Sequence, residues 1–332
     1  MNLTALNQKP KVGVVIVNWN GYEITRACLQ SVFRQSYSKC DVFVVDNGST
    51  ESSIYQIKVE FPSLSLICLP ENIGFTGGYN RGIEKALTSD CEYIFLLNND
   101  TIVDKNLLKE MIKIGITNPR CGIVTPKIYY YEKPTRIQSA GLQFSPWSGI
   151  VRMRGRKTLD CGQYDKVEEV PYASGCALLI KTKVIKKVGL LDEILFAYAE
   201  DIDWSIRARN AGYSILYAPL AKVWHKEEFG WAKHRSQSLR LYLSTRNVLW
   251  LVYKHGHWFH WFTVIPNFIF FGVGKYILLS LLRNDIYSIL ATIDGLTGFI
   301  RMLEKNPGFE RVELEKINKY SKSRLNCKIK NV

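Results

Sequence analysis

The chain has 332 residues, of which 47% are hydrophobic, so it can bury a sizeable core and is not expected to be disordered. Its formal charge of +14 favours an anionic partner, such as a nucleic acid, an acidic membrane surface or a phosphorylated ligand. The eight cysteines form no C-x-x-C pair, which argues against a zinc ribbon or a thioredoxin-type site. Cysteines within apolar runs favour a reducing compartment, and without a long apolar N-terminal core we expect no signal peptide and a cytoplasmic location.

The first 130 residues alternate strand-like and helix-like segments. Short β-branched runs predict strands buried on both faces, and apolar residues at helical spacing predict helices between them. The expected strands are 12–17, 41–45, 64–69 and 93–97, and the expected helices are 25–35, 53–60, 79–87 and one that begins at Asp104. This alternation predicts an α/β fold with a mostly parallel sheet and helices on both faces.

Polar motifs follow the carboxyl ends of these strands, where open α/β sheets bind ligands. We therefore expect four polar side chains that are distant in sequence to gather at one edge of the sheet. They are Asn18, Asp46, Asn72 and Asp100.

The fourth strand ends in LLNND, which places Asn98 and Asp100 two residues apart and on the same side of the strand. A carboxylate with a companion oxygen ligand can hold Mg2+ or Mn2+, and such an ion can bridge a diphosphate and neutralise the charge on a leaving nucleotide. An Asn-Asp turn that merely ends the strand is the alternative, and the motif alone does not exclude it.

Two further motifs point to a nucleotide. Asp46 in VVDNGST can accept hydrogen bonds from a base or ribose, or it can cap the next helix as part of a turn. The segment PENIGFTGGYNRG places several glycines before the expected helix, where backbone amides can approach an anion. Its spacing matches neither the Walker loop nor G-x-G-x-x-G, so the glycines alone are weak support.

The second part of the chain is less regular at first. Residues 130–170 are expected to form loops and short strands. Beyond them we expect strands at 172–180 and 213–217, and helices at 184–188, 199–210 and 239–253.

The helix at 199–210 begins with acidic residues, which either favour the helix dipole or supply a general base for an acceptor hydroxyl. Because Asp203 can pair with Arg207 four residues later, we rank Asp201 above Glu200 as the base and treat Asp203 as structural. His225 is a metal ligand only if the fold brings it to Asp100.

Taken together, the ordered motifs resemble the family 2 glycosyltransferases, and within them the rhamnosyltransferase-like branch that builds bacterial surface polysaccharides. The resemblance covers about residues 10–250. The motifs are VNWNG (17–21), VVDNGST (44–50), ENIGFTGGYNRG (71–82), LLNND (96–100), YASGCALLI (172–180) and YAEDIDWSIRARNAGY (198–213).

The resemblance implies a GT-A type fold and an inverting, metal-dependent hexosyl transfer from a nucleoside-diphosphate sugar. The lead donor is dTDP-rhamnose, with UDP-hexoses and UDP-galactofuranose as alternatives, and the acceptor is a glycan or a lipid-linked glycan. Donor identity, acceptor and linkage are not determined by the sequence.

The resemblance also implies roles for individual residues. Asn18 and Asp46 would contact the nucleoside, and Asn72, Gly77, Gly78 and Asn80 would line the donor site. Asp100 and His225 would bind Mg2+ or Mn2+, and Asp201 would be the base, with Glu200 as the second candidate. Asn98 stands where the family motif Asp-x-Asp often has an acid, which leaves one fewer negative ligand and makes His225 more important.

Three regions follow from this interpretation: a nucleotide-sugar-binding half (10–130), an acceptor-binding and catalytic half (131–235) and a helical, membrane-associating region with a basic tail (236–332). Residues 258–282 are long enough to span a bilayer and begin with aromatic residues typical of a membrane interface. They can instead form an in-plane or re-entrant segment, or a helical hairpin that belongs to the soluble fold or to an oligomer contact. The basic tail favours attraction to the inner face of a cell membrane.

Other functions have less support. A sugar nucleotidyltransferase or a dehydrogenase would need a glycine-rich loop after the first strand, where VNWNGYE stands instead. A non-catalytic carbohydrate-binding protein would not need both Asp100 and Asp201, and no nucleic-acid-binding motif is present.

Overall fold

The computed structural model describes residues 9–50, 54–226, 237–268 and 286–304, together with positions 274, 281 and 316. These residues divide into two compact units. The first holds 9–143, 152–196 and 200–226, and the second holds 144–151, 197–199 and the described residues from 237 onward. All the residues that the sequence predicts for the site therefore lie in the first unit.

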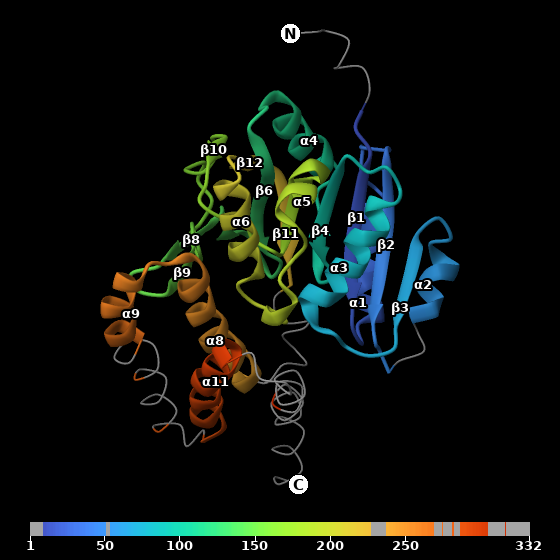
Figure 1. Ribbon diagram of the computed structural model, residues 1–332. Helices are drawn as coiled ribbons and strands as arrows, with labels where there is room; N and C mark the ends of the chain where they lie inside the picture. The colour runs from blue at the N-terminus through green and yellow to red at the C-terminus, as the bar shows by residue number, and fades with distance from the viewer. Residues whose placement is uncertain are drawn as a thin grey trace. The chain divides into compact units, whose positions relative to one another are not determined.

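The described part of the first unit is built on a ten-stranded mixed sheet in the order β10-β12-β6-β11-β4-β1-β2-β3, with β5 and β7 paired beside this path (Figure 1). Its parallel part consists of the four predicted strands, which are β1 (Val12–Asn18), β2 (Cys40–Asn47), β3 (Ser65–Leu69) and β4 (Tyr93–Asn98). The register pairs Asn18 with Asp46 on neighbouring strands, so their side chains lie at the same edge.

The rest of the sheet is mixed. Strand β11 (Ala177–Lys181) lies antiparallel between β4 and β6 (Cys121–Tyr130), and β12 (Ser214–His225) runs parallel to β6. The short strands are β5 (Thr101–Val103), β7 (Lys133–Ser139) and β10 (Glu168–Glu169), while β8 (Leu142–Ser145) and β9 (Ile150–Met153) form a separate two-stranded sheet.

Strand β6 was not among the predicted strands, although nine of its ten residues are buried. Proline in the middle of a strand removes a hydrogen-bond donor, and β6 contains Pro126. The pairing of β6 with β12 shifts register directly after Pro126, and such an irregularity is where a strand tolerates proline. Strand β12 is also longer than the predicted 213–217, and His225 is its last residue.

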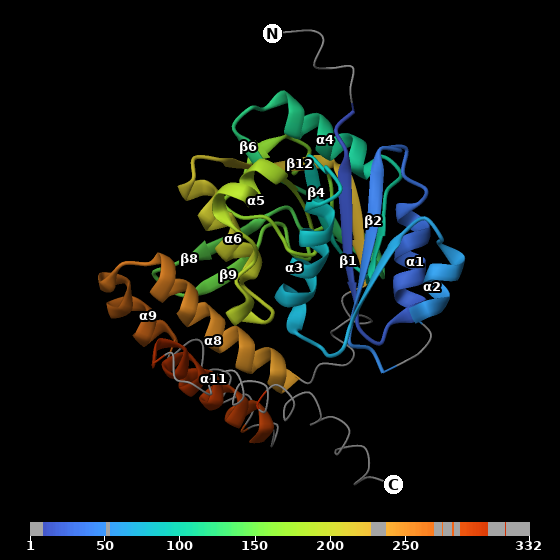
Figure 2. The same cartoon turned by 45° about the vertical axis from the view of Figure 1, so that its right-hand side comes forward.

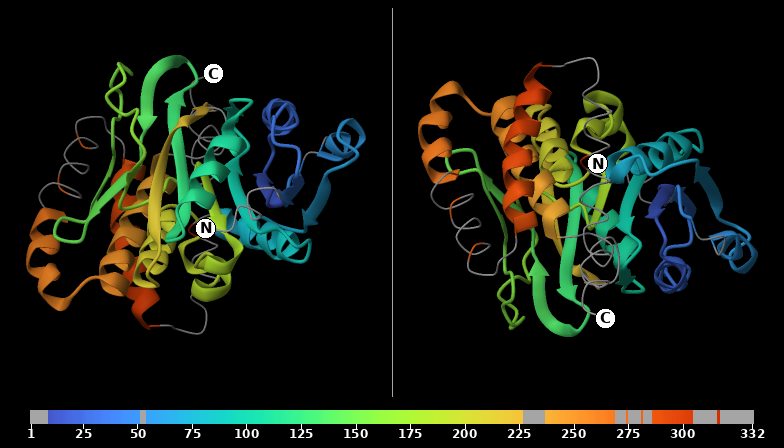
Figure 3. Two further views of the ribbon diagram at one scale, coloured as in Figure 1. Left: turned by 90° about the horizontal axis from the view of Figure 1, so that it is seen from above. Right: turned by 90° about the horizontal axis from the view of Figure 1, so that it is seen from below.

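Helices cover both faces of the sheet, as predicted. Along β1, Val14 and Ile16 belong to one hydrophobic cluster, and Val15 and Val17 belong to another. The first cluster includes α1 (Tyr22–Val32), α2 (Ile54–Glu60) and α4 (Leu107–Thr117), and the second includes α3 (Gly74–Leu87), α5 (Thr182–Val188) and α6 (Glu200–Asn210). Figures 2 and 3 show α1 and α3 on opposite sides of β1 and β2.

Helix α3 begins at Gly74, five residues before the predicted start, so most of the predicted glycine loop is helical. Glycine in this helix permits close packing on the sheet, because a Cβ atom at Gly82 would lie 2.3 Å from Val15 Cγ1 and one at Gly78 would lie 3.0 Å from Val17 Cγ1. Hydrophobic periodicity does not detect a helix face made of glycine, which explains the late prediction.

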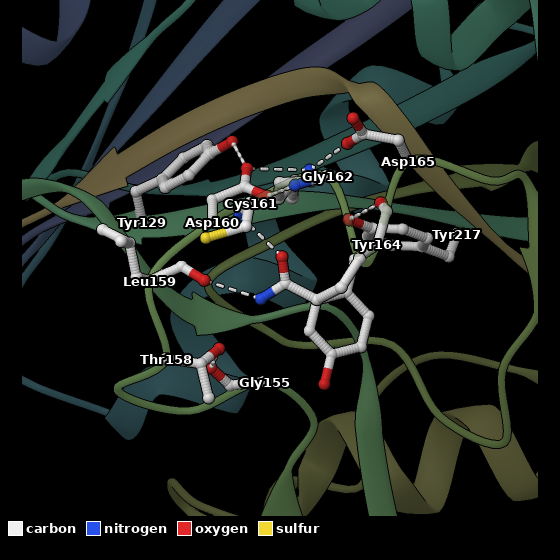
Figure 4. A network of polar contacts seen from close by, with 12 residues as sticks. Tyr129, Gly155, Thr158, Leu159, Asp160, Cys161, Gly162, Tyr164, Asp165 and Tyr217 are labelled. Atoms are coloured by element: carbon white, nitrogen blue, oxygen red, sulfur yellow. Dashed lines mark hydrogen bonds and ion pairs between the residues drawn. The ribbon is translucent and has the colours of Figure 1, made fainter.

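A polar network ties the segment between β9 and β10 to the sheet (Figure 4). Lys127 of β6 is buried, and its Nζ lies 2.9 Å from Asp160 Oδ2 and 2.6 Å from Asp165 Oδ1. Tyr129 also donates its hydroxyl to Asp160. Burial raises the pKa of Asp160, but the hydrogen bonds from Tyr129 and Lys127 together lower it by more. The net result is a pKa below the ordinary value of an aspartate.

The second unit is helical and contains α8 (Gln237–His255), α9 (Trp261–Asn267) and α11 (Ile286–Glu304), with a 3-10 turn η3 (Trp258–His260). Leu249 and Val252 of α8 pack with Val264 of α9 and Phe299 of α11. The predicted helix 239–253 is confirmed. Much of 258–282 and all of the basic tail except Lys316, which lies 2.8 Å from Asp294, fall outside the described residues.

Within the described residues, no helix combines the length and the apolar character that crossing a bilayer requires.

We predict that Lys127→Met destabilises the protein at neutral pH by about 3 kcal/mol, because it leaves the partly buried Asp160 carboxylate without its cation. Because the pKa of Asp160 is lowered on folding, its contribution is present above the unfolded value of about 3.9 and is lost as pH falls through the folded value. Urea unfolding should therefore show a gap between wild type and variant at pH 7 that narrows in acid.

The exposed neighbour Lys166 offers a matched control, since Lys166→Met should change stability by less than about 0.5 kcal/mol. Equal stability of Lys127→Met and Lys166→Met would contradict a stabilising role for the network.

Candidate functional site

The carboxyl ends of β1 and β2 form one corner of the site. Asn18 Nδ2 donates to Asp46 Oδ1 at 2.9 Å, and the hydroxyl of Ser49 donates to the same oxygen. Thr25 Oγ1 in turn donates to Asn18 Oδ1 at 2.7 Å. Asn18 and Asp46 are both buried, so these hydrogen bonds compensate the carboxylate for lost water and fix its orientation. The structure brings the two predicted nucleoside residues together, with Asn18 orienting Asp46.

A second pair of amides shapes the entry into α3. Asn47 is fully buried, and its Nδ2 donates to Gly74 O at 2.8 Å and to Asn72 Oδ1 at 3.1 Å. The backbone N–H of Ile73 donates to Asn47 Oδ1, and that of Gly74 donates to Asn72 Oδ1. Sequence reasoning missed Asn47, although its place directly after Asp46 at a strand end was the available signal.

Gly77, Gly78 and Asn80, which are also predicted to line the donor site, contact other parts of the protein. A Cβ atom at Gly77 would lie 2.9 Å from the Ile73 side chain, and Gly78 faces Val17. Asn80 Nδ2 donates to Leu191 O and to Glu193 Oε1, both at 2.9 Å, and Asn80 Oδ1 accepts from Leu191 N. These contacts join α3 to the segment before η2 (Glu193–Leu195), and a direct contact of these residues with a donor stays a prediction.

Asp100 and His225 meet at the same edge of the sheet. His225 can therefore serve as a metal ligand together with Asp100, which the sequence alone left open. His225 Nε2 lies 3.1 Å from Asp100 Oδ1, and β12 brings it there by pairing His225 with Thr101 of β5. Burial lowers the pKa of His225, but the nearby Cys176 sulfur and the Asp100 carboxylate raise it more, so the pKa lies well above its usual value. The position therefore favours positive charge beside Asp100.

Gln138 orients the histidine ring. Its Oε1 lies 2.9 Å from His225 Nδ1, and the side chain is buried. With Nδ1–H donating to Gln138, Nε2 would become available to a metal ion once the ion displaces its proton, as in metal-bound histidines whose other nitrogen is hydrogen-bonded. Sequence reasoning missed Gln138, because it lies on β7 and no local motif marks it.

The donor set fits a divalent ion held by two protein ligands. Adjacent ligands of an octahedral ion with bonds of about 2.1 Å are about 3 Å apart, close to the 3.1 Å between Asp100 Oδ1 and His225 Nε2. Among the described residues, no group of three or more His, Cys, Asp or Glu side chains converges on a metal site. Most positions of such an ion would therefore be filled by phosphate oxygens and water, as is usual for Mg2+ at nucleotide sites.

Asn98, the other polar residue of the motif, ends β4. Its Oδ1 lies 3.4 Å from the hydroxyl of the buried Tyr79, and its N–H donates to Cys176 O at 2.9 Å. The side chain thus lies between α3 and the strand edge, and its part in ion or donor binding stays a prediction.

Asp201 lies in the first turn of α6, where two backbone amides hold its carboxylate. Gly175 N donates to Oδ2 and Ile202 N donates to Oδ1, each at 2.8 Å. Burial raises the pKa of Asp201, these amides lower it, and the net effect is a raised pKa. A raised pKa makes the carboxylate a better proton acceptor, which suits the predicted base. Gly175 was missed, and a Cβ atom there would lie 3.3 Å from Asp201 Oδ2.

The neighbouring acidic residues differ in their surroundings. Asp203 is fully buried and its Oδ2 lies 2.8 Å from both Nε and Nη2 of Arg207, which also donates to Val188 O and Leu190 O. These contacts support the expected structural role of Asp203. Glu200 is also buried, and its catalytic role stays a prediction.

The backbones of two consecutive residues, Gly175 and Cys176, link the LLNND motif to Asp201 through hydrogen bonds. Cys176 O accepts from Asn98 N, and Gly175 N donates to Asp201. The edge of the sheet thus presents the hydrogen-bonded Asp46, the Asp100–His225 pair and the Asp201 carboxylate with its raised pKa.

Comparison with known proteins gives the family and the fold. A family model described as glycosyltransferase-like family 2 matches residues 10–244. The poly-beta-1,6-N-acetyl-D-glucosamine synthase of Staphylococcus aureus is 26% identical over 231 residues, which cover 66% of this chain and 53% of that protein. The chain thus spans about half the length of this relative.

Two further proteins are similar over comparable regions. The low-salt glycan biosynthesis hexosyltransferase Agl10 of Haloferax volcanii is 25% identical over 237 residues, covering 71% of this chain and 73% of that protein. A crystal structure of GalNAc-T7 with UDP, GalNAc and Mn2+ superposes with a TM-score of 0.56 at 18% identity, covering 66% of this chain and 44% of that one. The structural similarity confirms the predicted GT-A type fold.

We predict that His225→Ala and Gln138→Leu both weaken Mn2+ binding, the second by about 10–100-fold because it removes the hydrogen bond that orients the ligand. Calorimetric titration of Mn2+ into protein saturated with a nucleoside diphosphate would measure both. Arg136→Leu, an exposed substitution on the same strand, should leave the titration unchanged. An unaltered titration in His225→Ala would remove His225 from the ligand set.

Proposed function

The chain belongs to glycosyltransferase-like family 2, and on that premise we propose that it is an inverting, metal-dependent glycosyltransferase. It takes a hexosyl group from a nucleoside-diphosphate donor and attaches it to a glycan or lipid-linked glycan acceptor. The observation that carries the proposal is the 3.1 Å contact between Asp100 and His225, two residues far apart in sequence. Alone, the motif around Asp100 was compatible with a simple turn.

In the proposed reaction, the acceptor hydroxyl oxygen attacks the anomeric carbon as the bond from that carbon to the diphosphate oxygen breaks. The hydroxyl proton passes to the Asp201 carboxylate, whose orientation Gly175 N and Ile202 N maintain. Attack opposite the leaving group inverts the anomeric configuration. The nucleoside diphosphate leaves with the electron pair.

The donor is held at the carboxyl ends of β1, β2 and β4. Asp46, oriented by Asn18, accepts hydrogen bonds from the nucleoside. Asp100 and His225 would hold the Mg2+ or Mn2+, which would supply charge neutralisation for the leaving diphosphate. The GalNAc-T7 structure with UDP and Mn2+ supports a divalent ion in a protein of this fold.

L-rhamnose from dTDP-rhamnose remains our lead donor, on the resemblance of the motifs. The two similar proteins named as a hexosyltransferase and an N-acetylglucosamine polymer synthase give specific support to the second candidate, a UDP-hexose. UDP-galactofuranose is a third candidate. The names of these relatives also support a role in polysaccharide or glycan synthesis. On the resemblance of the motifs we propose that this synthesis serves the cell envelope and that the chain acts on the cytoplasmic side of the membrane.

We predict that Asp201→Asn lowers kcat by about 10²–10⁴-fold and leaves donor binding nearly unchanged, because the amide cannot accept the proton. In the wild type, activity should fall as pH falls through the pKa of Asp201, and this limb should lie above the ordinary value of about 3.9, since burial raises that pKa. Steady-state kinetics and nucleotide titration would measure both effects. Glu23→Gln, at an exposed carboxylate, is the control, and near-normal turnover in Asp201→Asn would refute the assignment.

A second prediction concerns the nucleotide. Cys68 is exposed on β3 and pairs in register with Asp46, whose charge contributes to raising its pKa. Bound nucleotide should therefore slow alkylation of Cys68 and leave Cys161, which is also exposed among the described cysteines, unaffected. Peptide mapping after alkylation with dTDP, UDP or GDP and Mn2+ would rank the nucleotides, and a screen of their sugars for hydrolysis would then identify the donor. Equal alkylation of Cys68 under every condition would argue against a nucleoside beside Asp46.

A further inference from the structure

An exposed aromatic surface lies entirely within the second unit. It consists of two tryptophans, two phenylalanines and an isoleucine, which we call the aromatic patch. Their exposed fractions are 51% for Trp147, 74% for Trp258, 37% for Phe259, 72% for Phe262 and 49% for Ile265. Single exposed apolar residues are normal on protein surfaces, but a contiguous group marks an interaction site.

The members of the patch are in contact with one another. The ring of Phe259 lies 5.6 Å from that of Trp147 and 6.0 Å from that of Trp258, and Trp258 lies 5.7 Å from Phe262. Ile265 follows Phe262 by three residues on α9, so the two share a helix face. Residues from the β8–β9 loop and from η3 and α9 thus form one surface.

Contacts with buried residues of the same unit hold the side chains of the aromatic patch in place. Thr263 Oγ1 donates to Trp147 O at 2.7 Å, and the Trp147 ring meets the buried His260 edge-on at 4.6 Å. Val264, on the opposite side of α9, is fully buried against Leu249 and Val252. The exposed rings are therefore held outward by the packing of the unit.

The charge of this region indicates the partner. Between Gln237 and Asn284 the sequence contains no Asp or Glu and five Lys or Arg, and residues 144–151 carry no charged side chain. Lys254, at the end of α8, is exposed just before the patch, and the ring of His257 lies 5.1 Å from that of Phe259. Tryptophan and phenylalanine in a segment with no acidic residue and an exposed lysine fit the headgroup region of an anionic bilayer, where rings enter the interface and a cation such as Lys254 meets phosphate.

We propose that the aromatic patch docks the protein on an anionic lipid surface. The side chains enter the interface from η3, α9 and the β8–β9 loop, and the excess of positive charge in this region, with Lys254 exposed directly before the patch in sequence, provides the attraction to charged headgroups. This docking does not depend on which sugar is transferred.

The test is flotation of the full chain with vesicles of phosphatidylcholine alone or mixed with phosphatidylglycerol. We expect binding to the mixed vesicles, weaker binding to phosphatidylcholine, and a loss of about tenfold or more in the partition coefficient for Trp258→Ser with Phe262→Ser, since each buried aromatic side chain contributes substantially. The matched control is Val59→Ser with Leu220→Ser, which removes two apolar side chains exposed by 83% and 62% in the first unit.

Several outcomes would overturn the proposal. They are no flotation of the wild type, equal flotation with both vesicle types, and undiminished flotation of the patch variant. Light scattering would show whether the patch instead joins two copies of the chain, in which case the patch variant would turn a dimer into a monomer. Thermal unfolding checks the fold of each variant, and Phe262→Ser with Ile265→Ser is a second patch variant that keeps both tryptophans.

Discussion

The direction of one strand determines how the site is assembled. Strand β11 runs antiparallel between β4 and β6, so it begins at the edge where its neighbours end. Its approach therefore brings Gly175 and Cys176 to the carboxyl ends of the parallel strands. There the backbone of Cys176 accepts from Asn98, and the backbone of Gly175 donates to Asp201. With an ordinary parallel strand in this place, the loop before it would lie at the opposite edge of the sheet.

The same rule applies to His225. Because β6 and β4 are both antiparallel to β11, they run in one direction, and β12 runs with β6. Strand β12 therefore ends at the same edge of the sheet as β4, and its last residue, His225, contacts Asp100. The mixed half of the sheet thus contributes a histidine and a carboxylate-binding amide to a site whose other residues come from the parallel half.

Amide side chains support the acidic residues and the local backbone of the site. Asn18 supports Asp46, Gln138 orients the partner of Asp100, and Asn47 fixes the start of α3. Amides suit these positions because they donate and accept in one plane without adding charge. Burying carboxylates costs free energy unless hydrogen-bond donors compensate them, and the amides supply such donors here.

The sequence by itself determined the parallel strands and the residues at their ends, because buried β-branched runs and polar strand-end motifs are local signals. It also predicted the Asp203–Arg207 pair, since helical spacing alone relates these two residues, whereas the role of Asp201 as the base stays a prediction. It did not reveal β6, whose proline obscures the pattern, nor the early start of α3, whose packing face is glycine. Only the tertiary structure decided that His225 meets Asp100, that Gln138 lies behind it and that Gly175 holds Asp201. These contacts depend on the order and direction of strands in the sheet, and no local stretch of sequence contains that information.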